Sequence, residues 1–467
     1  MLAKHRLENS TGNRIGFTVQ VFVFICFCKG LHKYFFLLWL LLVFFHLNLG
    51  CLAAIIFVAY VLFFSWLVAS LPFFGKTGLG RPLLVGLFVC KIVAGLAYAK
   101  FYSLPQYIDG SDTFRYFEMS KTETDWLLSN PWAFVKDFFH YGYASSGNLF
   151  SGQNSYWNDL KSSSIIKLLA VCNVFTLKSY YADLVLFNFI FFVGPVAFYR
   201  VMNNVFDGKK WVKVISIFLL PSFLFWCSGV HKDGLLFTCL AMLIFSVHKQ
   251  VTAGKIVPFA LVVCISCMVG IFALRNVVCL LLLPALAVWG LYNVFAAKKW
   301  LVVGAVYGIC AVLFFASAYL RPSLSMPQYT INKQNEFKVL KGGSQVQVRN
   351  LQPTALSFLA FMPTAADMAL LRPHIAEIKN ISYVPAIGEL FVLWFLAGLF
   401  LVNYSKVTNT KPQPAVVIFC LCFALSYLLL AGYTVTFSGA IVRYRSIVLP
   451  LLFCPLVCMA NIRSKLQ

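Results

Sequence analysis

The sequence predicts an all-α, polytopic transmembrane protein, and three observations support this fold class. Hydrophobic residues make up 61% of the 467 residues and charged residues only 11%, whereas soluble domains carry about 25% charged residues. The hydrophobic residues form continuous runs, which are typical of transmembrane helices and not of the alternating strands of a barrel. The net charge of +23 comes from Lys and Arg at the ends of these runs, so we do not expect nucleic-acid binding.

A basic N-terminal segment, residues 1–33, precedes a single polytopic membrane domain, residues 34–467, with about twelve expected spans. These spans are 34–49, 51–70, 83–102, 182–202, 212–227, 233–248, 256–274, 277–297, 301–320, 386–403, 414–434 and 445–461. The apolar stretch 17–28 is short for a span, and we treat 162–178 as an interfacial helix. No internal repeat or separate soluble domain is visible.

The distribution of Lys and Arg predicts the orientation of the chain. Basic residues concentrate in the segments on the side of the C-terminus, where the only acids are Glu8 and Asp207, and the positive-inside rule then places both termini in the cytoplasm. Two long polar segments, near 103–164 and 321–385, are therefore expected to be exterior loops. Neither loop contains any of the fifteen cysteines, so we expect no disulfide there. We interpret the cysteines inside apolar runs as small hydrophobic residues that pack against lipid or other helices.

The first exterior loop opens with two acids, Asp109 and Asp112, beside aromatic residues and directly after an expected span. Carboxylates in this position could bind a divalent cation or take a proton from a sugar hydroxyl. The alternative is a turn that caps the following helix, because Asp-Gly-Ser-Asp is also good turn chemistry. Both interpretations stay open.

A polar break at 228–234 separates two short apolar runs and contains His231, Lys232 and Asp233. Asp233 can cap the helix that begins there, and His231 and Lys232 would place cationic donors beside its N-terminus, which favours a bound anion. The alternative is a lysine that snorkels from a tight hairpin. Arg275 occupies a second hairpin with almost no polar linker and is a further candidate for anion binding.

Basic residues also stand at the ends of the second loop and of the last inter-span segment. Arg372 is followed by Glu377, and Arg443 and Arg445 precede the last expected span. Guanidinium groups suit bidentate phosphate binding, although these arginines could instead meet lipid headgroups. Arg443 and Arg445 would share a face in an extended segment but not on a helix. We expect Lys232, Arg372, Arg443 and Arg445 to surround one anion.

These motifs resemble those of bacterial multispanning polysaccharide-assembly proteins, which border on O-antigen and exopolysaccharide polymerases and on GT-C-type glycosyltransferases. The matching residues are Asp109, Asp112, Pro221, Ser222, Trp226, Ser228, Gly229, Lys232, Asp233, Leu371, Arg372, Pro373, Glu377, Asn380, Arg443, Tyr444, Arg445 and Pro450. The chain departs from the pattern at His374 and Ile375, where aromatic residues are expected. The resemblance covers residues 109–450, and each motif in it is short.

The resemblance implies a glycosyltransferase or polymerase for polyprenyl diphosphate-linked glycans at the outer face of the bacterial inner membrane. In that role Asp109, Asp112 and Glu377 are the catalytic candidates. The substrate-binding candidates are His231, Lys232, Arg275, Arg372, Arg443 and Arg445. The expected partners are the lipid-linked glycan and membrane lipid, and other polysaccharide-assembly proteins are further candidates. A divalent cation is a candidate cofactor, although no metal ligand set is identified.

Two alternatives remain open. A flippase or transporter of lipid-linked oligosaccharide would also need basic residues, together with a cavity that can be reached from both sides. The concentration of candidates on one face favours the enzyme. A non-catalytic scaffold would leave the charged hairpins unexplained, because charges between short apolar runs are costly in a membrane.

Overall fold

The computed structural model confirms an all-α fold over the residues that it describes. These residues are 51–105, 107–108, 110–138, 156–295, 299–320, 324–340, 342–378, 383–407 and 415–459. Within these ranges the β-structure is limited to one isolated bridge between Gln345 and Phe437. The N-terminal segment 1–33, the expected span 34–49 and the candidate Asp109 lie outside the described residues.

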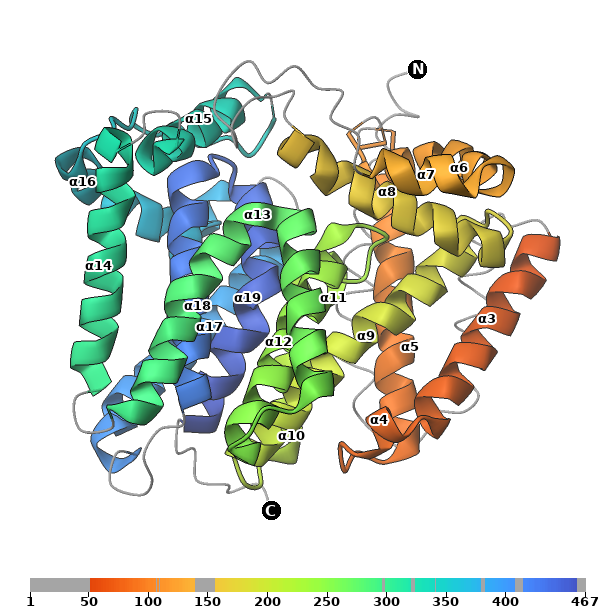
Figure 1. The fold of residues 1–467 in the computed structure, drawn as a ribbon, viewed down its shortest axis with the longest axis horizontal. Helices are drawn as coiled ribbons and strands as arrows, with labels where there is room; N and C mark the ends of the chain where they lie inside the picture. Colours follow the sequence, from red (N-terminus) through yellow and green to blue (C-terminus); the bar gives the residue numbers. More distant parts are fainter. Residues whose placement is uncertain are drawn as a thin grey trace.

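Eight described helices are long and apolar enough to cross a membrane, which confirms a multispanning membrane protein. They are α3 (Cys51–Ser70), α5 (Arg81–Tyr102), α9 (Tyr180–Val205), α12 (Lys232–Ala253), α13 (Pro258–Val294), α14 (Lys299–Leu320), α18 (Ala415–Thr434) and α19 (Ser438–Met459). The helix α17 (Val384–Val407) runs beside them, and the short α4 (Pro72–Gly75) links α3 to α5. Figure 1 shows these helices as one bundle, with α9, α12, α18 and α19 in its interior.

Three expected spans depart from separate regular helices. The segment 212–227 forms two short helices, α10 (Lys210–Phe218) and α11 (Pro221–Trp226). Pro221 occupies the first turn of α11, where its missing N–H costs nothing. The expected spans 256–274 and 277–297 are the two arms of α13, which bends at Arg275, where φ is −155° and ψ is 86°. Figure 1 shows the arms as an inverted V with its apex at the upper end.

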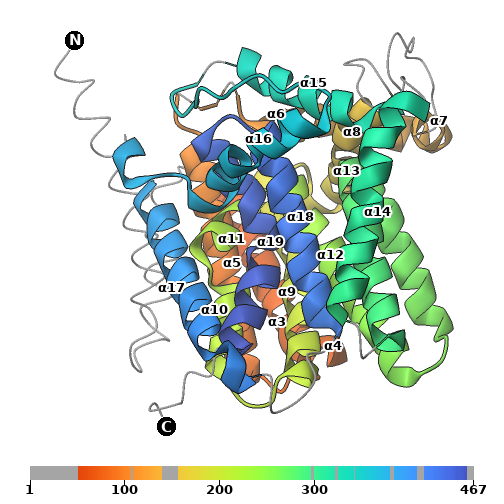
Figure 2. The same cartoon turned by 90° about the vertical axis from the view of Figure 1, so that its left-hand side faces the viewer.

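The two polar segments gather at that same end of the bundle (Figures 1 and 2). The first contains α6 (Asp112–Ser129), α7 (Pro131–Asp137) and α8 (Tyr156–Thr176). The second contains α15 (Met326–Val339), α16 (Ala355–Ala366), the π-helix η3 (Asp367–Leu371) and the 3₁₀-helix η4 (Ile375–Glu377). We call this end the polar end. In Figure 1, α8 lies across the tops of the long helices, and it is not among the described helices that are long and apolar enough to cross a membrane.

Buried contacts attach the polar end to the bundle. Lys167 of α8 is buried and bonds to Glu123 at 3.0 Å and to Asp137 at 2.9 Å, which ties α6, α7 and α8 together. On the opposite side, α16 approaches α18 so closely that a Cβ at Gly432 would lie 2.0 Å from the carbonyl oxygen of Ala365. The helices of the first polar segment are thus joined to one another, and those of the second are packed directly on the bundle through α16.

Candidate functional site

The break between α11 and α12 is held by polar side chains from two neighbouring helices. The Lys91 ammonium of α5 donates to the carbonyl of Cys227 at 2.6 Å and contacts the Ser228 hydroxyl at 3.2 Å. The Asn188 amide of α9 donates to the Ser228 carbonyl at 2.9 Å. The carbonyl groups that the end of α11 exposes therefore find partners inside the bundle, as buried backbone groups require.

Asp233, on the first turn of α12, binds two arginines from distant parts of the chain. The Arg275 guanidinium at the apex of α13 donates to one carboxylate oxygen at 2.7 Å. The Arg443 guanidinium of α19 donates to the other oxygen at 2.6 Å. Asp233 is fully buried, so the two cations supply the pairing that a buried carboxylate needs.

Aromatic side chains contact both of these guanidinium groups. Arg275 donates to the Tyr427 hydroxyl at 3.1 Å and lies 4.5 Å from the centre of the Tyr444 ring. The guanidinium carbon of Arg443 lies 5.9 Å from the centre of the Trp226 ring. Both arrangements are cation–π contacts, and they leave Arg275 and Arg443 side by side above one carboxylate.

Asp112 stands at the exposed edge of this group. Arg443 reaches the Asp112 carboxylate at 3.4 Å, and Arg115 lies 3.8 Å from it. Thr113, the next residue of α6, donates to the Val230 carbonyl at 2.9 Å, which places the start of α6 over the break. Asp112 is about a third exposed, at 31% of its side chain, so it is accessible in a way that Asp233 is not.

Lys232 differs from its neighbours because it has no hydrogen-bond or ion-pair partner within the part of the chain that the structure describes. It is half-buried, and the charges that act on it most strongly are those of Arg275, Asp233, Arg443 and Asp112. We call Asp112, Lys232, Asp233, Arg275 and Arg443 the Asp233 cluster. It holds three bases and two acids, a surplus of one positive charge.

Lys161 of α8 extends this basic surface. Burial, followed by the positive charges of Lys333, Lys232 and Arg275, lowers the pKa of Lys161 to about 8. Lys333 itself forms an ion pair with Glu336 at 2.7 Å and adds no net charge.

His231 is placed differently from the cationic donor that the sequence suggested. Its Nδ1 accepts the backbone N–H of Asp233 at 3.2 Å, so the imidazole caps α12 as an acceptor. The ring is fully buried and lies 5.0 Å from the Tyr98 ring. An Nδ1 that accepts a hydrogen bond carries no proton, so His231 acts as a neutral cap in this arrangement.

Arg372 belongs to a second group of charges. Its guanidinium donates to Asp367 at 2.8 Å and also to Glu377, so both candidates from the end of the second loop pair with each other. His374 Nε2 lies 2.8 Å from the other Asp367 oxygen. Arg372 therefore has little capacity left for an anionic ligand.

Arg445 fixes the backbone of this second group. Its guanidinium is buried and donates to the carbonyl oxygens of Arg372 at 2.8 Å and Ala369 at 3.2 Å. Glu389 of α17 is the acid that acts most strongly on Arg445. We call Asp367, Arg372, His374, Glu377, Glu389 and Arg445 the Arg372 cluster. It holds two arginines and three acids.

The structure thus divides the expected single anion site into two clusters. The reason is that α19 begins at Ser438, so Arg443 and Arg445 both lie on a helix, where residues two apart face different directions. Arg443 joins Lys232 and Arg275, whereas Arg445 joins Arg372. Asp109 and Asn380 lie outside the described residues.

Sequence reasoning missed several members of these clusters. Tyr427 and Lys161 lie in segments with no local motif, whereas Tyr444 stands between two candidate arginines and was not itself chosen. Asp367 could have been noticed as an acid five residues before Arg372 at the end of an apolar run. Lys91 was visible as a charge within a span, but its partner on α11 was not.

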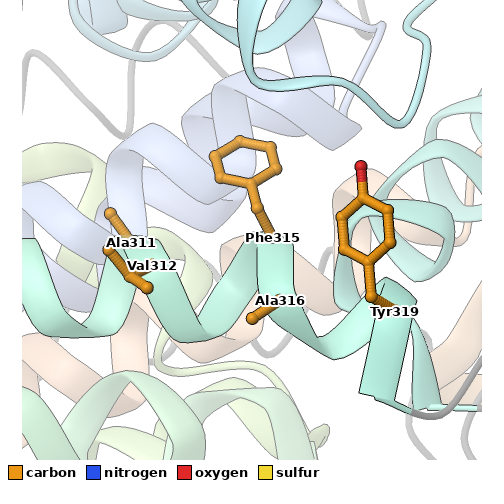
Figure 3. A pocket seen from close by; sticks show the side chains of 5 residues that line it. All are labelled: Ala311, Val312, Phe315, Ala316 and Tyr319. Carbon is orange, nitrogen blue, oxygen red and sulfur yellow. The ribbon is translucent and has the colours of Figure 1, made fainter.

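No group of three or more His, Cys, Asp or Glu side chains in the described ranges is arranged to hold a metal ion. A shallow apolar depression lies on α14 and is lined by Ala311, Val312, Phe315, Ala316 and Tyr319 (Figure 3). It lies on a helix that is barely covered by the rest of the bundle, and its lining has no ionisable group apart from the exposed Tyr319 phenol. It is a surface feature separate from both clusters.

The chain was also compared with protein-family models, curated protein sequences and solved structures, and no match was found. The class of protein that the fold defines is therefore a multispanning α-helical membrane protein with a buried charge cluster beneath its polar end.

Proposed function

We propose that this protein is a membrane glycosyltransferase of the polymerase type, which acts on polyprenyl diphosphate-linked glycans at the outer face of the bacterial inner membrane. The single observation that carries the proposal is the surplus positive charge of the Asp233 cluster. Lys232 has no polar partner there in the described ranges, and a charge in that position is costly unless a ligand uses it. A lipid-linked diphosphate supplies the missing negative charge while its lipid stays in the bilayer.

The chemistry assigned to the cluster follows from its charges. The acceptor hydroxyl oxygen attacks the anomeric carbon of the donor sugar, and the bond from that carbon to the diphosphate oxygen breaks. The diphosphate leaves with the bonding electrons, and Lys232 with the two guanidinium groups stabilises its charge. The hydroxyl proton passes to a carboxylate, for which accessible Asp112 is the better candidate. Asp233, with both oxygens occupied, positions the arginines.

The length distribution of the cell-surface glycan tests this proposal. Deletion of the gene should abolish the length ladder of the cell-surface glycan while a single lipid-linked unit survives, and Lys232→Ala or Asp112→Asn should reproduce this loss at normal protein levels. Trp132→Ala, an exposed change on α7, is the matched control and should complement fully. Complete loss of the single unit from the cell surface would instead support a flippase. Full complementation by both variants would overturn the proposal.

The sidedness of the polar end is a separate prediction. The segment between α15 and α16 and the turn between α12 and α13 lie at opposite ends of the bundle (Figure 1). Gln347 is exposed in the first and Lys255 in the second. A cysteine introduced at Gln347 should react with a membrane-impermeant thiol reagent in intact spheroplasts, and one at Lys255 should react only after lysis. The reverse pattern, measured against the labelling of the parent chain, would place the polar end in the cytoplasm.

A further inference from the structure

We infer that the aromatic rings beside Arg443 form a binding platform for a sugar ring that bears the phosphate group. The platform consists of Trp226 at the end of α11 and Tyr102 at the end of α5, with Tyr98 beneath them. The inference rests on the proposed function, because the phosphate is expected at Arg443 and Lys232. Its ligand class is a glycosyl phosphate, as opposed to a bare phosphate or a lipid headgroup without a sugar.

The aromatic neighbours of Trp226 among the described residues meet its ring edge to face and are not stacked on it. Trp226 contacts Tyr98, Tyr102 and Phe225 at centroid distances of 5.9, 6.3 and 5.3 Å, and in each case the planes meet at a steep angle of 75°, 66° and 90°. No other ring in the described residues lies flat against Trp226. Tyr98 is almost fully buried, at 1% exposure, whereas Trp226 and Tyr102 are only partly covered.

The position of Trp226 differs from that of the exposed tryptophans. Trp66, Trp132, Trp211 and Trp300 have 52–68% of their surface exposed, as is usual for tryptophans that meet the membrane interface. Trp226 is half-buried, and the Arg443 guanidinium is 5.9 Å from its ring centre. It therefore faces the charge cluster inside the protein.

A sugar phosphate matches this combination of groups. One face of a pyranose ring presents C–H groups that pack against an aromatic face, while its hydroxyl groups reach polar neighbours. The phosphate on the anomeric carbon would then lie toward Arg443 and Lys232. Asp112, which contacts Arg443 at 3.4 Å, stands at the same edge, where an acceptor hydroxyl must approach.

Binding to the purified full-length protein in nanodiscs tests the platform. The probes are glucose 1-phosphate, galactose 1-phosphate and N-acetylglucosamine 1-phosphate, with inorganic phosphate and inorganic pyrophosphate as the sugar-free anions. At least one sugar phosphate should bind the wild type more tightly than inorganic phosphate does. Trp226→Ala should weaken that binding about tenfold, a change of about 1.4 kcal/mol, and leave pyrophosphate affinity within about twofold. Trp226→Phe should restore most of the loss.

Two further variants keep the test decisive. Tyr102→Ala provides a second change to the platform if Trp226→Ala does not fold, and Trp132→Ala should bind all probes as the wild type does. The platform is overturned if no sugar phosphate binds more tightly than inorganic phosphate, or if the folded Trp226 and Tyr102 variants bind sugar phosphates normally. Failure of the proposed function gives a different result from failure of the platform. In that case pyrophosphate does not bind the wild type, or it binds equally well to Lys232→Ala.

Discussion

The Asp233 cluster and the Arg372 cluster use the same residue types in opposite proportions. In the Asp233 cluster two guanidinium groups share one buried carboxylate and Lys232 pairs with none of the described residues, so bases outnumber acids. In the Arg372 cluster one guanidinium binds two carboxylates and a second binds backbone carbonyls, so acids outnumber bases. Arginines that look equivalent in the sequence thus differ in the structure. Those of the Asp233 cluster belong to a group with surplus positive charge, whereas those of the Arg372 cluster are bound by carboxylates and carbonyl oxygens of the protein.

The largest expected effect is the loss of stability when the central carboxylate of the Asp233 cluster is removed. Replacing Asp233 with Ala leaves two mostly buried guanidinium groups without their anion, and breaking a buried ion pair in this way costs about 3–5 kcal/mol. We expect a large fall in thermal stability and in membrane yield. The matched control is Asp125→Ala, since Asp125 pairs with Lys178 at 2.5 Å on the surface and is 67% exposed. Equal stability of the two variants would contradict the central role of Asp233.

A smaller loss of stability is expected from Arg372→Lys. Lysine keeps the charge but cannot bond to Asp367 and Glu377 in the same planar geometry. Hydrogen bonds to charged groups contribute about 1.5–3 kcal/mol, and partial exposure of the ion pairs lowers this figure. Pyrophosphate affinity should stay within about twofold of the wild type. A clear drop in pyrophosphate affinity with unchanged melting temperature would show that Arg372 binds the anion after all.

Lys232→Ala should show the opposite pattern. Because Lys232 has no polar partner in the described ranges, its removal should leave the melting temperature unchanged or slightly raised. Pyrophosphate should bind about tenfold more weakly, which corresponds to about 1.4 kcal/mol. Isothermal titration calorimetry and thermal unfolding on the same sample measure both quantities. A destabilised variant with normal anion affinity would make Lys232 a structural residue.

The smallest effect concerns the pH dependence of anion binding. Lys161, whose pKa is lowered to about 8, is protonated below that pH and neutral above it. Binding of sulfate, whose charge is constant, should therefore weaken severalfold between about pH 7 and about pH 9. Lys161→Gln should reduce this change, with Lys232 responsible for the remainder, while Lys333→Gln leaves most of it in place. A steep profile in the Lys161 variant would assign the titration to another group.

The sequence alone determined the all-α multispanning class and much of the element order. Continuous apolar runs have to form helices in lipid, because each backbone group must find its partner within the segment. For the same reason the polar break at 228–234, the hairpin at Arg275 and the interfacial character of 162–178 were visible as interruptions of the runs. The sequence did not show which of the basic residues at these interruptions meet in the fold.

Only the tertiary structure decided which of these candidates meet. Asp233 and Arg443 are far apart in sequence, and their contact depends on how α12 packs against α19, which no local pattern encodes. Whether Arg443 and Arg445 point together depended on where α19 begins, a boundary that sequence patterns locate poorly because helix ends follow capping and packing. Two charged side chains form a pair only where helix packing brings them together. Because the spans have similar hydrophobicity, the sequence does not specify which of them pack side by side.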